Sequence, residues 1–282
     1  MERLMNRKLL HLYFIGFTAV CTVLRLFLKF ASVDPLTGYY EGYGAVVWLF
    51  NLLLLAGIGG CLLLGWLQPR RSYLPVSRIR RMAAVLVGVA CFPAGVSGLA
   101  AQSGQLEMLQ GAITMPALIA ALVVTLVSFL CLGIAPFVTG GLFLMIARRT
   151  EDSQSRPIHG LLLLVPLAWQ VALLLSSFME YTAIRSVSDQ MLTTVMLILL
   201  APFLLAHARV LGQIDPDRGA RQAVVFGLPF ALVAFCACMG MLAASLAGRG
   251  VTVAPSPVFS AFYLFFGIYA AAFCLELTPV KG

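Results

Sequence analysis

The sequence predicts an all-α membrane protein, a polytopic transmembrane helical bundle of about eight spans. Of its 282 residues, 61% are hydrophobic and only 11% are charged, and the mean hydropathy is +0.98. A soluble domain carries about a quarter charged residues, so this chain could not cover itself with polar surface. Long apolar runs recur along the chain, and roughly 20 such residues suffice to cross the hydrocarbon core of a bilayer.

The predicted spans follow one another with short connections, which indicates a single integral membrane domain over residues 1–282. They cover residues 9–30, 44–67, 82–101, 112–147, 158–179, 188–211, 222–247 and 256–276. The fourth is longer than a bilayer requires and contains Pro136, so it forms either one long tilted helix or a broken one. Similar residues at the starts of the third and seventh spans permit a weak 4+4 parallel repeat.

The distribution of basic residues predicts that both termini are cytoplasmic. Most of the 19 lysine and arginine residues lie in the two terminal segments and in the loops after the second, fourth and sixth spans. Positive charge marks the cytoplasmic side of a membrane protein. The net charge of +8 therefore reflects topology, and we expect the lipid bilayer, and no nucleic acid, as the partner of the basic residues.

One group of charged residues falls on the opposite, outer side. Arg25 and Lys29 are four residues apart and share one face of the first span. A charge near the bilayer centre costs at least ~2.5 kcal/mol, so Arg25 requires a partner or water. Two interpretations stay open: an outward-facing polar cavity, or a structural ion pair, which we favour. The acidic residues predicted on the same side are Asp34, Glu41, Glu180 and Asp189.

Two polar residues within apolar spans complete the candidate site. Asn51 in the second span and Gln170 in the fifth could line such a cavity, although hydrogen bonding between helices is the commoner use of such residues. After the first span, Asp34-Pro35 and the following Gly38 have the composition of a turn. We therefore expect a structured loop beside Arg25.

The sequence predicts no metal site, no cofactor and no catalytic residues. His11, His159 and His207 lie at the predicted cytoplasmic ends of spans and could bind zinc only if those ends met. The seven cysteines lie in apolar segments without metal-ligand spacing, where they behave as small hydrophobic residues. No acid, base and nucleophile converge on one membrane face, so we expect a protein that is not an enzyme.

The outer loop carries a motif that resembles a known family. Arg25 followed by Asp34-Pro35-Leu36-Thr37-Gly38-Tyr39-Tyr40 is similar to the pattern R…DPxTGFF/Y. That pattern occurs in an uncharacterised family of multi-pass membrane proteins from anaerobic Gram-positive bacteria. Residues 164–169 and 178–188 also resemble that family's fifth-span region, so the similarity extends over most of the chain. The resemblance implies a helical bundle in a bacterial cell membrane and no particular activity.

Two hypotheses for function follow. The first is a non-enzymatic integral membrane protein with a sensory, regulatory or assembly role, which meets a membrane-protein partner or a second copy of itself. A small-residue stripe on the second or fourth span would provide the contact. The second hypothesis is a small-solute or ion transporter with an outward-facing polar cavity around Arg25.

Overall fold

The computed structural model confirms the predicted fold class. It describes residues 2–34, 39–67, 77–110, 115–149, 157–181, 188–249 and 256–277, without the side chains of 2–7, 101–110, 117 and 179–181. The described elements are helical apart from one isolated β-bridge, and eight of the described helices are long and apolar enough to cross a membrane. Helices suit these segments because lipid offers no hydrogen bonds to the backbone.

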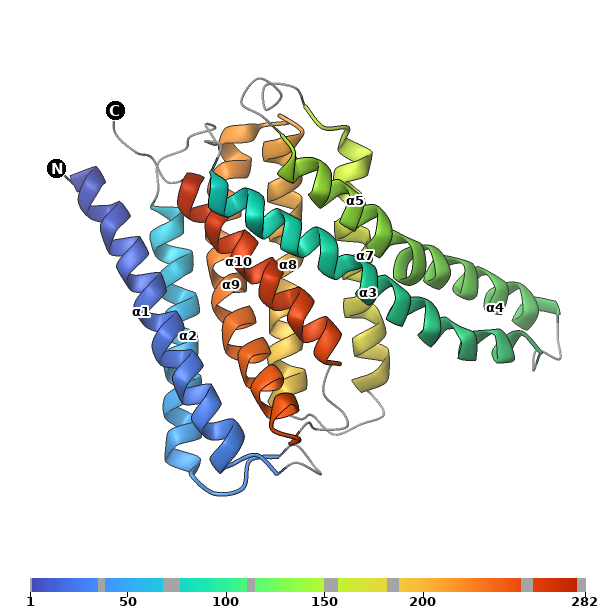
Figure 1. Cartoon of the computed structure of the whole chain (residues 1–282), viewed down its shortest axis with the longest axis horizontal. Coiled ribbons are helices and arrows are strands. Elements are labelled where there is room, and N and C mark those ends of the chain that lie inside the picture. Colours follow the sequence, from blue (N-terminus) through green and yellow to red (C-terminus); the bar gives the residue numbers. More distant parts are fainter. Residues whose placement is uncertain are drawn as a thin grey trace.

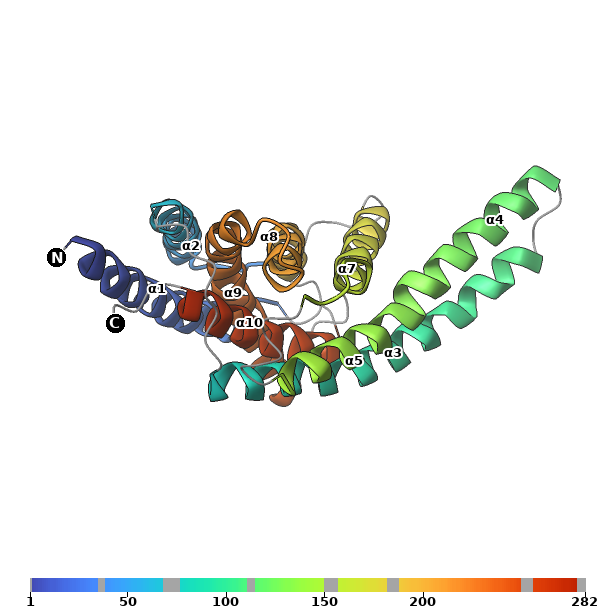
Figure 2. The same ribbon diagram turned by 90° about the horizontal axis from the view of Figure 1, so that it is seen from above.

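The helices form two rows, and α9, in the first row, is the most central helix of the bundle. In chain order they are α1 (Glu2–Ala31), α2 (Gly44–Trp66), α3 (Arg78–Gln110), α4 (Met115–Ser128), η1 (Phe129–Ile134), α5 (Ala135–Ala147), α7 (Gly160–Tyr181), α8 (Ser188–Leu211), α9 (Pro216–Leu246) and α10 (Pro257–Leu277). Seen from above, α2, α9, α8 and α7 form one row, and α1, α10, α3 and α5 form the other (Figure 2). Helix α9 contacts α1, α2, α8 and α10, and 78% of the residues in its most apolar 18-residue stretch are buried.

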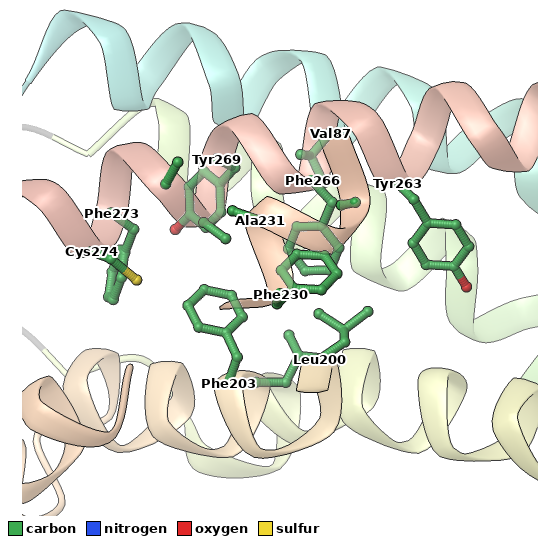
Figure 3. Close-up of a cluster of buried hydrophobic side chains, with 14 of the residues drawn as sticks. Val87, Leu200, Phe203, Phe230, Ala231, Tyr263, Phe266, Tyr269, Phe273 and Cys274 are labelled. Carbon is green, nitrogen blue, oxygen red and sulfur yellow. The ribbon is translucent and has the colours of Figure 1, made fainter. Parts of the chain in front are cut away.

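An aromatic cluster fills the centre of the bundle where α8, α9 and α10 meet (Figure 3). Phe230 of α9 lies 6.1 Å from Phe203 of α8 and 5.7 Å from Phe266 of α10, measured between ring centroids. All three side chains are at most 1% exposed. Such ring pairs contribute about 0.5–1.5 kcal/mol beyond the burial of their surface, so this cluster holds the three helices on which part of the candidate site depends.

The described part of the predicted 112–147 span, Met115–Ala147, is one long helical segment that contains a π-helical turn. α4, the π-helix η1 and α5 follow one another without a break from Met115 to Ala147. Pro136 is the second residue after η1. Because proline has no N–H and clashes with the preceding turn, a local wide turn accommodates it. The structure therefore shows a long interrupted helix, the first of the two alternatives left open.

Several helices extend beyond the predicted spans, and the end of α3 and the start of α9 are two clear cases. α3 continues to Gln110, nine residues beyond the predicted end at 101, because the polar residues that follow are mostly good helix formers. α9 begins at Pro216 and not at 222, since Asp215 caps it and accepts a hydrogen bond from the Arg218 amide. Both extensions are polar and could not be recognised from hydropathy.

The third and fourth spans together form a hairpin that projects sideways from the bundle. The end of α3 and α4 extend away from all other helices in both views (Figures 1 and 2). α4 packs mainly on α3 and η1. In the most apolar 18-residue stretch of the candidate span Leu118–Ala147, only 11% of the residues are buried.

The glycines in these spans serve packing within the chain. A Cβ on Gly140 of α5 would lie 2.9 Å from the Gly88 carbonyl oxygen of α3, so the two backbones touch. On α2, Gly57 faces Phe17 of α1 and Gly60 faces Tyr13. The predicted small-residue stripe on these spans is therefore largely occupied by the protein's own helices, which is the usual role of such residues.

Candidate functional site

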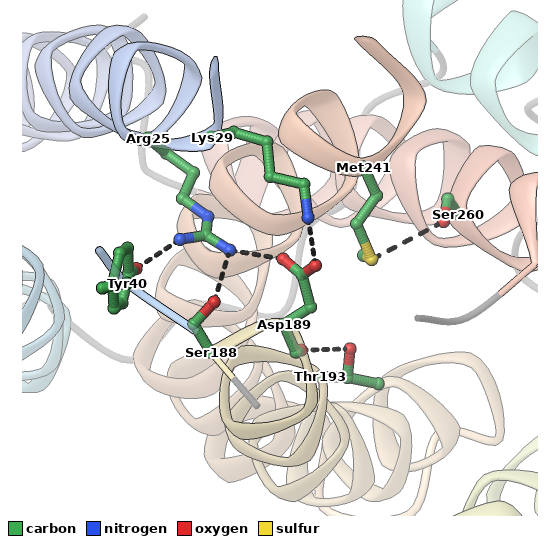
Figure 4. Close-up of polar contacts among 8 residues, drawn as sticks. All are labelled: Arg25, Lys29, Tyr40, Ser188, Asp189, Thr193, Met241 and Ser260. Atoms are coloured by element: carbon green, nitrogen blue, oxygen red, sulfur yellow. Dashed lines mark hydrogen bonds and ion pairs between the residues drawn. The ribbon is translucent and has the colours of Figure 1, made fainter. Parts of the chain in front are cut away.

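The candidate site is a buried cluster in which two cations share one carboxylate. Arg25 and Lys29 project from the same face of α1, and Asp189 is the second residue of α8. The Arg25 Nη2 donates to one carboxylate oxygen of Asp189 and the Lys29 Nζ donates to the other (Figure 4). Because Asp189 lies in the first turn of α8, the helix dipole also favours its negative charge.

The outer loop supplies a third contact to Arg25. An antiparallel bridge pairs Val33 with Tyr40, and the Glu41 amide donates to the Ser32 carbonyl at 2.6 Å. This closure directs Tyr40 at the cluster, where its hydroxyl accepts a hydrogen bond from Arg25 Nη1 and its ring lies 5.6 Å from the guanidinium. The loop is thus structured, as predicted, at its two ends; residues 35–38 lie outside the described part.

The absence of a side chain at Gly240 of α9 leaves space for the Arg25 side chain to reach from α1 to α8. Helix α9 lies between these two helices (Figure 1), and the Arg25 side chain must pass it to reach Asp189. A Cβ on Gly240 of α9 would lie 3.3 Å from Arg25 Cγ and 3.8 Å from Nε. With no side chain there, the arginine crosses α9 and also approaches Ser188, whose Oγ lies 3.4 Å from Nη2.

The cluster is sealed from solvent in this conformation. Arg25 is 0% exposed, Lys29 4% and Asp189 1%. With Lys29 protonated, the formal charges of the described side chains leave one positive charge uncompensated within the cluster. The buried Arg25 Nε has no hydrogen-bond partner among the described residues. A buried charge is tolerated only when it is well paired, so Asp189 carries the electrostatic balance of this region.

The remaining predicted site residues do not all join the cluster. Asp34 is half-buried in the loop, Glu41 is exposed and Asn51 is exposed on α2. The side chain of Glu180, the partner we considered for Arg25, lies outside the described part. Gln170 of α7 is buried elsewhere, and its Oε1 accepts from the Tyr263 hydroxyl of α10 at 2.9 Å.

Several site residues had no clear signal in the sequence. Tyr40 belongs to the motif quoted above, but nothing in the motif shows that it contacts Arg25. Gly240 contacts Arg25 only because the chain folds back on itself, and neither spacing nor composition distinguishes it. Arg80 and Glu276 each lie at the edge of an apolar run, and the structure pairs them with Nη1 and Oε2 3.1 Å apart. Charges at the ends of spans could have suggested a pair but not its partner.

One of the three histidines predicted at the cytoplasmic ends of spans, His207, is buried in the core. His207 is 2% exposed, lies 2.8 Å from the Tyr269 hydroxyl through Nε2 and stacks on Phe143. Within the described residues, no group of three or more His, Cys, Asp or Glu side chains could hold a metal ion. His207 is therefore a hydrogen-bonded core residue, in contact with aromatic rings.

Comparison with known proteins adds no relative. No protein-family model, no curated protein and no solved structure matches this chain. The resemblance of the outer loop to the R…DPxTGFF/Y family accordingly stays a prediction. The composition and the eight membrane-spanning helices of the described chain identify a multi-pass integral membrane protein.

Proposed function

We propose that this is a non-enzymatic integral membrane protein with an assembly role, which binds another membrane protein through the hairpin of α3 and α4. The observation that carries the proposal is the exposure of α4. Its apolar side chains are open around the helix, with exposed fractions of 73% at Met115, 62% at Ile119 and 60% at Val124. Its principal contacts are with α3 and η1.

The dimensions of the hairpin support this role. The span Leu118–Ala147 has 30 residues and, at 1.5 Å per residue, is about 45 Å long. The hydrocarbon core is only about 30 Å thick, so this helix must tilt strongly or extend beyond the bilayer. A helix that leaves the bundle in this way gives up van der Waals contacts with its own chain, and these are the contacts that drive helix association in lipid.

The sequence at the end of α3 is more polar than that of α4. Residues 101–110, at the end of α3, include several polar side chains, Gln102, Ser103, Gln105, Glu107 and Gln110. A polar segment of this kind does not remain in hydrocarbon, so the hairpin combines an apolar flank with a polar end. A membrane-protein partner can pack on the apolar flank of α4.

Site-specific photocrosslinking in native membranes tests the proposal. A photoreactive amino acid replaces Val124 on α4, and the matched control replaces Leu63 on α2, which is similarly exposed at 68%. We expect a discrete protein adduct from position 124 and only lipid adducts from position 63. Lipid adducts alone at both positions would contradict the assembly role.

The transporter hypothesis has one observation in its favour. Among the described side chains, the cluster has two cations for one carboxylate and the Arg25 Nε has no hydrogen-bond partner, so a small anion is the substrate class that it would attract. Transport requires a second conformation in which water reaches the cluster. A Thr193→Cys variant tests this, because Thr193 lies one turn along α8 from Asp189 and is only 5% exposed. Labelling by a membrane-impermeant thiol reagent added from outside favours transport, and complete protection excludes it.

A further inference from the structure

A pocket at the other end of the bundle has features of a ligand site. It has a volume of about 250 Å³ and lies between the end of α2 and the beginning of α9; its lining residues are Trp66, Arg218, Arg221, Gln222, Val225 and Phe226. The two helices are in close contact beside it, since a Cβ on Gly65 would lie 3.1 Å from the Val225 Cα. Its position is therefore fixed by backbone packing.

The polar atoms of the pocket are arranged for an anion. Its lining has two arginines and no carboxylate among the described residues. The Arg221 guanidinium lies 4.7 Å from the centroid of the Trp66 ring, and its buried Nε has no hydrogen-bond partner in the described chain. Arg209 Nη1 donates to Gln222 Oε1 at 2.6 Å, which leaves the amide N–H groups of Gln222 available as donors.

Among the described residues, the acidic side chains at the start of α9 do not cancel this charge. Asp215 precedes α9 and its carboxylate accepts from the Arg218 amide at 3.4 Å, so it serves as a helix cap. Asp217 is exposed in the first turn. Neither residue lines the pocket, which retains a positive character.

We propose that this pocket binds the phosphate of an anionic phospholipid, with an acyl chain along Val225 and Phe226. The combination of arginines with apolar walls suits a phosphate that has a hydrocarbon tail. Trp66 is 63% exposed at the end of its span, a location typical of tryptophans at the level of the lipid headgroups. The predicted topology puts this end on the cytoplasmic side, where anionic lipids concentrate.

Fluorescence quenching of Trp66 by brominated lipids tests the proposal in the full-length protein. A Trp48→Phe background removes the other exposed tryptophan, and Trp169 is only 1% exposed, so contact quenching reports Trp66. The protein is placed in phosphatidylcholine vesicles that contain dibrominated phosphatidylglycerol or dibrominated phosphatidylcholine. We expect phosphatidylglycerol to be enriched at Trp66 by roughly fivefold for each arginine that contacts it.

Two variants and one competitor decide the outcome. Arg221→Gln lowers the enrichment by roughly fivefold, whereas Arg78→Gln, an exposed arginine outside the pocket, leaves it unchanged. Excess inorganic phosphate at constant ionic strength does not displace the lipid; displacement would identify a free phosphate site and overturn the lipid assignment. Equal quenching by the two lipids, or an equal loss in Arg78→Gln, would also overturn it. Gel-filtration elution of each variant shows that it is folded.

Discussion

Replacing Asp189 by asparagine is the sharpest test of the buried cluster. The substitution leaves two cations, Arg25 and Lys29, on one face of α1 without a counter-charge, at sites that are at most 4% exposed. Breaking a buried ion pair by removal of one partner costs about 3–5 kcal/mol. With a shift of about 2–4 °C per kcal/mol for a chain of this size class, the melting temperature falls on the order of 10 °C.

The same reasoning predicts a small effect for Lys29→Met. This change removes the second cation and leaves Arg25 and Asp189 as a neutral pair, so the cost stays below about 1 kcal/mol. In the double variant Lys29→Met with Asp189→Asn, one unpaired cation remains in place of two. The double variant is therefore expected to melt above the single variant Asp189→Asn.

A thiol-reactive fluorophore provides the assay because six of the seven cysteines are buried in the folded protein. Unfolding in detergent exposes them and gives a melting curve for each variant. Asp217→Asn, at an exposed position in the first turn of α9, is the matched control and leaves the melting temperature unchanged. If Lys29→Met lowers the melting temperature as much as Asp189→Asn does, the inference that the cluster can lose the positive charge of Lys29 at little cost is refuted.

Two further substitutions test the contacts around the cluster and in the hairpin. Tyr40→Phe removes the acceptor of Arg25 Nη1 and costs about 1–3 kcal/mol, whereas Tyr43→Phe, at a 55% exposed position, is neutral in the same melting assay. Gly140→Ala places a Cβ 2.9 Å from a carbonyl oxygen of α3 and destabilises the protein by about 1–3 kcal/mol. Gly141→Ala, with nothing within 4 Å, is its control, and equal melting temperatures for the two would contradict the close backbone packing.

The candidate site could be predicted from the sequence only in part. Spacing placed Arg25 and Lys29 on one face, and topology placed Asp189 on the same side of the membrane. That Asp189, and not Asp34 or Glu41, pairs with Arg25 depends on distances between helices that are far apart in the sequence. The sequence could not show that Asn51 lies outside the cluster, because a polar residue in an apolar span does not reveal which way its side chain points.

The α3–α4 hairpin, like the candidate site, could be predicted from the sequence only in part. Hydropathy identified the 112–147 segment as apolar and too long, and Pro136 indicated an interruption. It could not show that α4 leaves the bundle, because a helix surrounded by lipid and one surrounded by protein have equally apolar sequences. That decision depends on packing with neighbouring helices.

The sequence by itself determined that lipid surrounds this protein, how many spans it has, and that it contains a membrane-embedded charge that needs a partner. These are consequences of local composition, since each apolar run must form a helix in lipid whatever its neighbours are. Only the tertiary structure decided that Arg25 and Lys29 share Asp189, that Gly240 lets the arginine pass α9, and that the α3–α4 hairpin stands apart. Each of these depends on contacts between distant segments, which composition and spacing do not encode.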